Sequence, residues 1–178
     1  MSGGFEPLGG ETVYHGRLVD VRVERFRHAD GAEVTREVVR HRGAVAIVAH
    51  DEQQLWLVRQ PREAVGESGL LEIPAGRLDV EGEQPLQAAQ RELAEEIGRG
   101  ARTWEPIFSY YVSAGITDER VRLFRATDLY DAHAHNEEED ERIEIVRWPL
   151  ADVQAAIDAC VDAKTLIGLL WLARRLNV

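Results

Sequence analysis

The first part of the chain alternates between apolar and charged residues, and a period of two residues predicts extended strands. Within residues 12–27, Val19, Val21 and Val23 fall on one face of the strand, and Arg22 and Glu24 fall on the other. The dipeptide Asp30-Gly31 then favours a tight turn, and residues 33–39 return as a second strand. The pattern therefore predicts a small N-terminal antiparallel sheet.

This sheet is expected to form a region of its own. Residues 1–11 are rich in glycine and polar groups, so they are expected to be loose. We place the N-terminal β-sheet region at residues 1–41 and a larger domain at residues 42–178.

Short apolar runs and helical patterns follow one another through the rest of the chain. Strands are predicted near residues 43–49, 55–58, 70–73, 103–112, 120–126 and 143–148. Helices are predicted over residues 85–97, 151–160 and 164–176. This order of elements is typical of a mixed α/β fold.

The helix over residues 85–97 has suitable residues at both ends. Pro85 fits the first helical turn, and Gly98 fits the position just after the last one. At about 100° per residue, one apolar stripe is formed by Leu86, Ala89, Leu93 and Ile97.

Three carboxylates lie beside this stripe. Glu92 and Glu96 are four residues apart, and Glu95 is three residues from Glu92. Like charges at this spacing destabilise a helix, and a bound cation would remove the penalty. Oxygen ligands without thiolates favour Mg²⁺ or Mn²⁺. Arg91 can orient Glu95, and the alternative interpretation is a solvated acidic helix with one ion pair.

Composition narrows the functional classes. The chain has 21 basic and 32 acidic residues and a formal charge of −11, which argues against general nucleic-acid binding. No apolar run approaches the roughly 18 residues of a membrane span, and residues 1–16 do not resemble a signal peptide. We expect a cytoplasmic protein without a membrane partner. The single cysteine, Cys160, is expected to occupy an ordinary packed position.

The run LEIPAGRLDVEGEQPLQAAQRELAEEIG contains a longer motif. Its members, in order, are Gly76, Glu83, Arg91-Glu92-Leu93, Glu95-Glu96 and Gly98. This order resembles the Nudix box, in which a glycine and a glutamate precede an Arg-Glu-apolar-X-Glu-Glu-X-Gly run. The loop between Gly76 and Glu83 is one residue longer than the family pattern, which leaves the role of Glu83 open. Arg99 also replaces an apolar residue of that pattern.

The resemblance implies a Nudix-type α/β/α sandwich with a mixed sheet. It further implies that Glu92 and Glu96 ligate Mg²⁺ with support from Glu95, and that the backbone carbonyl of Ala75 is another ligand. The metal would activate the water that attacks phosphorus.

The resemblance also implies a general base in a late acidic loop. In this chain that loop is HNEEEDERIEIVRW, in which Glu141 takes the matching position and Glu139 is the second candidate. The alternative interpretation is a flexible acidic loop without a catalytic role.

Further motifs resemble the ADP-ribose pyrophosphatase branch of the family. They include LLEIPAG, VRQPR and FSYYVSAGITDER. In that branch, the residues matching Arg62, Glu119 and Arg36 lie near or contact the substrate. ADP-ribose would be cleaved to AMP and ribose 5-phosphate. The alternative for each arginine is an ordinary surface charge.

One residue leaves the substrate open. Ala114 stands where ADP-ribose enzymes commonly have proline, so another nucleoside diphosphate sugar, such as GDP-mannose, is the alternative. The resemblance implies a homodimer through the N-terminal sheet, with Tyr14 and Phe26 as candidates for stacking on adenine. A non-catalytic Nudix binding module is disfavoured because the box glutamates are all present.

Overall fold

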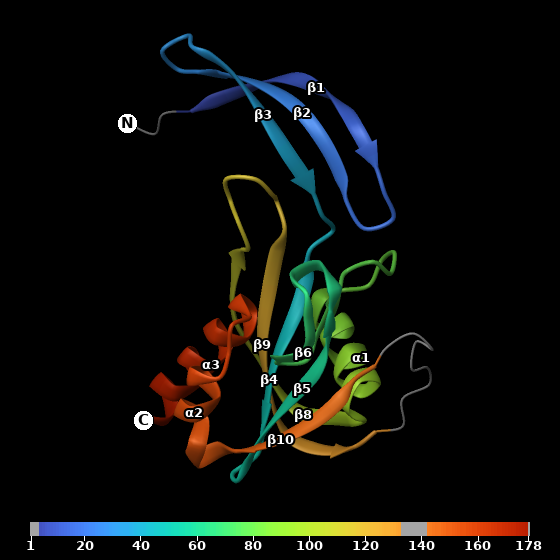
Figure 1. The fold of residues 1–178 in the computed structure, drawn as a ribbon, viewed down its shortest axis with the longest axis vertical. Helices are drawn as coiled ribbons and strands as arrows, with labels where there is room; N and C mark the ends of the chain where they lie inside the picture. Colours follow the sequence, from blue (N-terminus) through green and yellow to red (C-terminus); the bar gives the residue numbers. More distant parts are fainter. Residues whose placement is uncertain (1–3, 133–141, 178) are drawn as a thin grey trace. The chain divides into compact units, whose positions relative to one another are not determined.

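The computed structural model describes residues 4–132 and 142–177. These residues form two compact units, each with its own internal contacts (Figure 1). The N-terminal unit comprises Met1–Gly43 and Tyr110–Arg120, and the main unit comprises Ala44–Ser109 and Val121–Val178.

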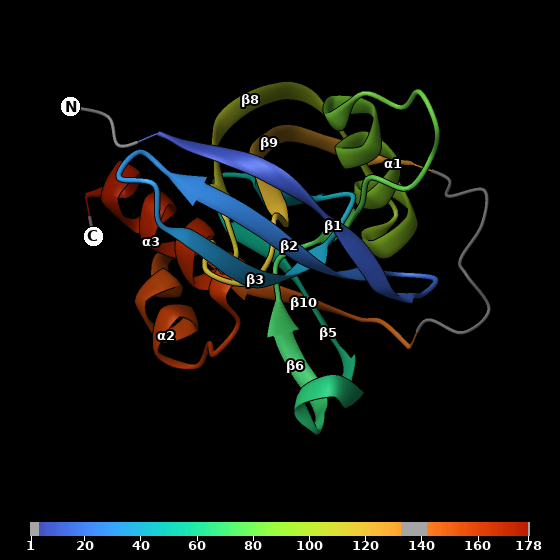
Figure 2. The same cartoon turned by 90° about the horizontal axis from the view of Figure 1, so that it is seen from above.

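The N-terminal unit is built on a three-stranded antiparallel sheet. Its strands are β1 (Phe5–His15), β2 (Asp20–His28) and β3 (Glu33–Arg40), in the order β1-β2-β3 (Figure 2). The segment Tyr110–Arg120 joins this unit because Val39 donates its N–H to the carbonyl of Ile116, at 2.8 Å.

The prediction that residues 1–11 are loose is wrong for the described part of that segment, since β1 begins at Phe5. Backbone pairing with β2, rather than a side-chain pattern, makes these residues a strand. Gly10 permits this pairing, because an added Cβ there would lie 2.3 Å from the carbonyl oxygen of Val23.

The single strand predicted over residues 12–27 is interrupted by a turn. Gly16 donates its N–H to the carbonyl of Val19 at 3.0 Å, and β2 begins directly afterwards. The turn at Asp30-Gly31 is confirmed, because His28 donates to the carbonyl of Ala32 at 2.9 Å.

A larger mixed sheet forms the centre of the main unit. Its strands are β4 (Ala44–His50), β5 (Gln54–Arg62), β6 (Glu67–Glu72), β7 (Ala75–Arg77), β8 (Arg99–Tyr111), β9 (Arg120–Asp131) and β10 (Glu144–Pro149). The order is β10-β5-β4-β9-β8, with β6 paired to β5 and β7 paired to β4. β4 and β9 run parallel, whereas β4 and β5 run antiparallel. Strand β7 was not predicted, because its three residues look like a turn until they pair with β4.

Helices cover both faces of this sheet. Ile47 of β4 belongs to a buried cluster that also contains Ala89 and Leu93 of α1 (Pro85–Ile97). Val48 points to the opposite face and packs against α3 (Ala163–Leu176). A Cβ added to Gly168 of this helix would lie 3.0 Å from Cγ2 of Val48. Figures 1 and 2 show α1 and α3 on opposite sides of the sheet, which confirms the α/β/α sandwich.

Helix α1 has the predicted bounds. Gln84 and Gln87 form a capping box at its start, and Gly98 ends it in a left-handed conformation with φ +64°. The apolar stripe was partly wrong, since Leu86 is 39% exposed. The buried side of the helix instead includes Ala88 and Glu96, which the apolar pattern alone does not reveal.

The C-terminal part is more finely divided than predicted. The helix expected over 151–160 consists of a short 3-10 turn, η2 (Leu150–Asp152), and α2 (Val153–Asp158). A second 3-10 turn, η1 (Glu63–Val65), follows β5.

Cys160 is buried, as predicted. None of the helices in the described part of the chain has the length and apolarity that a membrane crossing requires.

Candidate active site

Arg91 gathers three carboxylates on one side of α1. Its Nε and Nη2 donate to the two carboxylate oxygens of Glu83, at 3.0 and 3.1 Å. Its Nη1 donates to Glu92 and to Glu95, at 2.8 Å each. The hydrogen bonds with Glu83, together with the nearby Glu92 charge, raise the pKa of Arg91 further above its ordinary value. The guanidinium therefore offsets the repulsion that the helix spacing creates.

The lengthened loop before α1 does not displace Glu83 from the site. Glu83 donates its N–H to the carbonyl of Val80 at 3.2 Å, and Gly82 takes a left-handed conformation with φ +79°. This tight turn absorbs the additional residue, so that Glu83 reaches Arg91 from the loop.

Two glutamates of α1 face the Pro74-Ala75-Gly76 segment. Glu96 is 7% exposed, and its Oε2 accepts the N–H of Ala75 at 3.0 Å. The carboxylate of Glu92 lies so near Gly76 that an added Cβ would be 1.8 Å from its Cδ. Pairing of β7 with β4 fixes the backbone that both carboxylates meet.

The chemistry of these groups fits a hard divalent cation. Two carboxylates and the adjoining backbone carbonyl of Ala75 would supply oxygen ligands only. Within residues 4–132 and 142–177, there is no cluster of three or more Asp, Glu, His or Cys side chains that could hold a metal ion. Divalent cations such as Mg²⁺ are commonly bound through one or two carboxylates, with water and substrate phosphates completing the shell.

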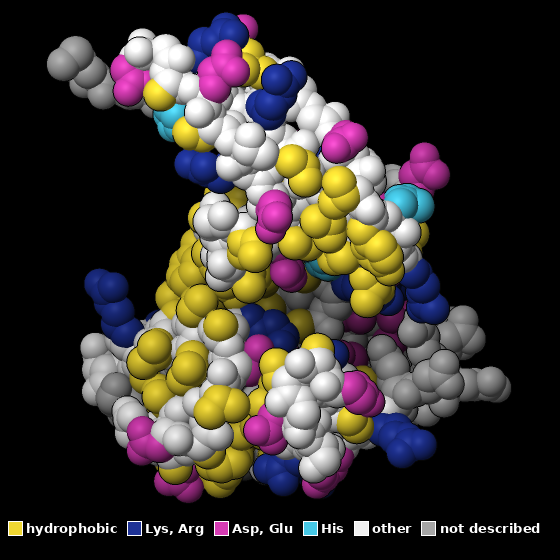
Figure 3. Space-filling view, turned by 45° about the horizontal axis from the view of Figure 1, so that its top comes forward, with side chains coloured by type: hydrophobic (Ala, Val, Ile, Leu, Met, Phe, Trp, Pro, Cys, Tyr) yellow, Lys and Arg dark blue, Asp and Glu magenta, His cyan; other side chains and the backbone are white. Residues whose placement is uncertain are grey.

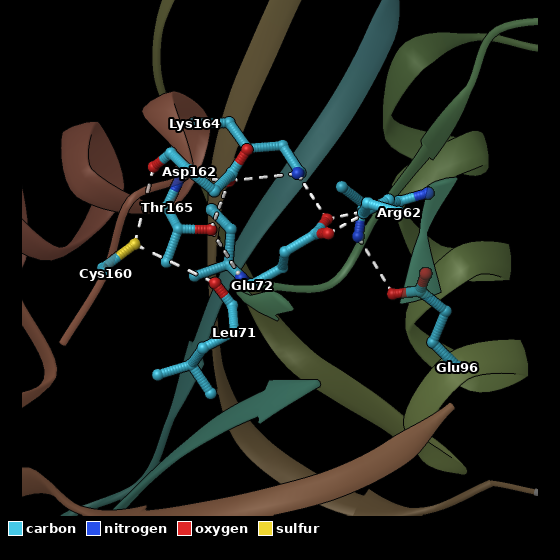
Figure 4. A network of polar contacts seen from close by, with 10 residues as sticks. Arg62, Leu71, Glu72, Glu96, Cys160, Asp162, Lys164 and Thr165 are labelled. Atoms are coloured by element: carbon cyan, nitrogen blue, oxygen red, sulfur yellow. Dashed lines mark hydrogen bonds and ion pairs between the residues drawn. The ribbon is translucent and has the colours of Figure 1, made fainter. Parts of the chain in front are cut away.

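Arg62 lies close to α1, and its guanidinium is hydrogen-bonded to Glu72. Its Nε and Nη2 donate to Glu72, at 2.6 and 2.7 Å. The hydrogen bond with Glu72 is the largest cause of its raised pKa, and the charge of Glu96 contributes as well. Figure 4 shows Arg62 between the carboxylates of Glu72 and Glu96. Its side chain remains 41% exposed, so part of the guanidinium is accessible.

Other candidates from the sequence belong to the N-terminal unit. Arg36 is exposed and donates to the backbone carbonyl of Thr35 at 2.8 Å. Glu119 lies 3.9 Å from Nδ1 of His41. Their substrate contacts stay predictions. Glu139 and Glu141 lie outside the described residues.

The candidates predicted from the sequence did not include Glu72 and Lys164, the two residues that support Arg62. Glu72 is fully buried, and Lys164 donates to it at 2.5 Å. A charged residue inside the short apolar run LLEI was the available signal, because a buried carboxylate requires a partner. A second signal was that Lys164 is the only lysine of the sequence.

Comparison with known proteins agrees with this architecture. The NUDIX domain family matches residues 39–167. An ADP-ribose pyrophosphatase of Mycobacterium tuberculosis is 44% identical over 140 residues, covering 76% of this chain and 67% of the relative. An ADP-ribose pyrophosphatase of Bacillus subtilis is 36% identical over 169 residues, covering 93% of this chain and 90% of the relative.

A solved structure supports the same assignment. A crystal structure of an ADP compounds hydrolase superposes with a TM-score of 0.83 at 28% identity, covering 97% of this chain and 93% of that one. The chain combines a mixed-sheet sandwich with an acidic helix that faces a Pro-Ala-Gly segment. These features define a class of metal-dependent hydrolases, and the relatives point to the same class. The chain belongs to the Nudix family and is a Nudix hydrolase.

Proposed function

We propose that this hydrolase cleaves ADP-ribose to AMP and ribose 5-phosphate and that it uses Mg²⁺. The substrate is supported by the two ADP-ribose pyrophosphatases, of which the one from Bacillus subtilis matches almost the whole chain. Diphosphate cleavage is supported by one structural observation above the others. Glu92 and Glu96 meet the backbone of Ala75 and Gly76 on the face of α1 that Arg91 organises.

Each part of the proposed site has its own task. A bound Mg²⁺ would offset charge on the diphosphate and lower the pKa of the attacking water. Glu92 and Glu96 would hold it together with the Ala75 carbonyl, while Arg91 keeps the glutamate side chains in place. Arg62 would donate hydrogen bonds to the phosphate oxygens, for which the planar guanidinium is suited.

The reaction consumes one water. The water oxygen forms a bond to one phosphorus, and the bond from that phosphorus to the bridging oxygen breaks, which yields the two monophosphates. Glu141, or Glu139 in second place, is proposed to accept the proton of the water; both lie outside the described residues.

We propose a homodimer formed through the N-terminal sheet, in which Arg36, Glu119 and an aromatic residue such as Tyr14 complete the substrate site. Large apolar side chains are exposed on this unit, and Figure 3 shows apolar side chains gathered on its visible face. Tyr14 is 59% exposed and Phe5 is 63% exposed. Exposed apolar area of this kind is common at subunit contacts. Placement in the cytoplasm stays a prediction from the sequence.

The turn at Ala114 bears on the alternative substrates. The backbone carbonyl of Ser113 accepts the N–H groups of Ile116 and Thr117, at 3.0 and 2.9 Å, so the turn closes without a proline. The absence of proline is therefore a weak reason to prefer GDP-mannose, and ADP-ribose remains the first choice.

Hydrolysis of a substrate panel tests the proposal. ADP-ribose, GDP-mannose, UDP-glucose, NADH and diadenosine polyphosphates are compared with Mg²⁺, for the wild type and for Glu96→Gln. We expect AMP and ribose 5-phosphate from ADP-ribose, and loss of activity in the variant. Preference for another member would refute the substrate, and an unaffected variant would refute the metal-site assignment.

A further inference from the structure

A fully buried carboxylate supports the arginine of the proposed site. Glu72, the last residue of β6, is 0% exposed and accepts two hydrogen bonds from Arg62. Burial alone would raise the pKa of Glu72, but the hydrogen bond from Arg62 and the charge of Lys164 outweigh this effect and lower the pKa. Glu72 is therefore ionised at neutral pH and is balanced by two cations.

The second cation, Lys164, is the only lysine in a sequence that otherwise uses arginine for its basic residues. Its Nζ donates to Oε2 of Glu72 at 2.5 Å and to Oδ2 of Asp162 at 3.0 Å, and its side chain is 19% exposed. An ammonium group is a compact charge that can contact two carboxylates at once, whereas a guanidinium requires a planar arrangement.

Lys164 is itself held in place by the start of α3. Asp162 caps this helix by accepting the N–H of Thr165 at 3.0 Å and its hydroxyl at 2.6 Å. The hydroxyl oxygen of Thr165 accepts the N–H of Ile73 at 2.9 Å. The first turn of α3 is thus bonded to the backbone next to Glu72, and Lys164 has little freedom to move away.

These residues form a series of alternating charge across the main unit (Figure 4). The series runs through Asp162, Lys164, Glu72, Arg62 and Glu96. Pairing with Glu72 occupies two of the five N–H donors of Arg62 and fixes the plane of the guanidinium. The remaining donors are then oriented before a substrate arrives.

We propose that Lys164 is a positioning residue, which acts through Glu72 to orient Arg62 for the diphosphate of the substrate. The proposal rests on the proposed function. Without the Lys164 charge, Arg62 would be the remaining cation hydrogen-bonded to Glu72. The guanidinium would then be drawn more strongly to the buried carboxylate, and its accessible donors would be turned away from the phosphates.

Lys164→Met removes this charge and keeps most of the side-chain volume. We expect kcat/KM for ADP-ribose to fall roughly tenfold, mainly through a higher KM, because Arg62 would be misplaced rather than lost. Lys164→Arg keeps the charge but not the compact geometry, so its kcat/KM should fall less than that of Lys164→Met. Arg174→Met is the matched control, since it removes a cation from an exposed position on the same helix and should leave kcat/KM unchanged.

Combination with Arg62→Ala separates positioning from a general structural effect. If Lys164 acts through Arg62, Lys164→Met should have no further effect on kcat/KM in the Arg62→Ala background. The same set of variants is measured for the Kd of ADP, which requires no catalysis. If the losses in kcat/KM of the two single variants multiply in the double variant, the proposal is overturned. A loss in Arg174→Met equal to that in Lys164→Met would also overturn it.

Two further outcomes need separate readouts. If Lys164→Met does not fold, which a thermal unfolding curve would show, the same comparison is made with Lys164→Gln. If the wild type binds ADP without cleaving ADP-ribose, the proposed substrate fails, while the ADP series still decides the role of Lys164. A wild type that does neither overturns both proposals.

Discussion

The carboxylate of Glu92 lies directly against the backbone of Gly76, and a Cβ at Gly76 would be 1.8 Å from Glu92 Cδ. Strand β7 supplies the glycine and helix α1 supplies the glutamate, so this contact joins the two elements of the proposed metal site. Any side chain at position 76 would occupy the space that the carboxylate now takes.

Gly76→Ala should therefore displace the Glu92 carboxylate while leaving the fold intact. The colliding atoms are at the flexible end of a side chain, so we expect the unfolding midpoint to change little. We expect kcat/KM to fall by about 100-fold or more, because a misplacement near 1 Å is costly for catalysis. Steady-state kinetics and thermal unfolding measure the two effects.

Gly69→Ala is the control for this substitution. Its Cβ would meet only Arg59 Cδ and Cγ, at 3.2 and 3.3 Å, and these atoms belong to a flexible side chain. Full activity in Gly69→Ala beside a large loss in Gly76→Ala would support the assignment. Equal activity of both variants would show that the Glu92 position is unimportant.

Arg91 provides a second test, because its fork holds Glu83 by two hydrogen bonds while Nη1 contacts Glu92 and Glu95. Lysine keeps the charge but cannot make these contacts together. We expect Arg91→Lys to lower kcat/KM by roughly 10- to 100-fold, as for partners that orient metal ligands. The Mg²⁺ concentration for half-maximal activity should rise in parallel. An unchanged Mg²⁺ dependence would argue against Arg91 orienting metal ligands.

The buried charge of Glu72 makes a prediction for stability. Glu72→Gln would leave Arg62 and Lys164 near each other without the carboxylate between them, and we expect a loss of roughly 3 kcal/mol in unfolding free energy. Glu33→Gln is the control, because its ion pair with Arg27 is about half exposed and should contribute far less to stability than the buried carboxylate of Glu72. Urea unfolding compares the variants, and similar losses in both would contradict the role assigned to Glu72.

The acidic helix could be predicted from sequence because its cause is local. Pro85 and Gly98 mark its ends, and the spacing of the glutamates fixes which of them share a side. Leu86 was placed wrongly because periodicity cannot show which side of a helix a neighbouring sheet covers. The burial of Glu96 likewise depends on its hydrogen bond with Ala75, which is distant in sequence.

Contacts between distant segments explain the other differences. Residues from Phe5 onward form a strand because β2 pairs with them, and their own composition gives no such indication. The link from Lys164 to Glu72 spans 92 positions along the chain, so no local pattern reveals it. The sequence showed the unusual residues, a lone lysine and a charge in an apolar strand, but not that they are partners.

A buried histidine predicts how stability depends on pH. His50 is 7% exposed, its Nδ1 donates to the carbonyl of Asp51 at 2.9 Å, and its Nε2 accepts from Arg125 Nε at 3.0 Å. Burial lowers the pKa of His50, and the nearby Arg125 charge lowers it further. The folded protein thus favours the neutral ring. This contribution to stability is complete above the unfolded pKa of about 6.5 and is lost as the pH falls through the folded pKa. We expect unfolding free energy to decrease more between pH 8 and pH 5 in the wild type than in His50→Gln, and parallel curves in urea unfolding would contradict this.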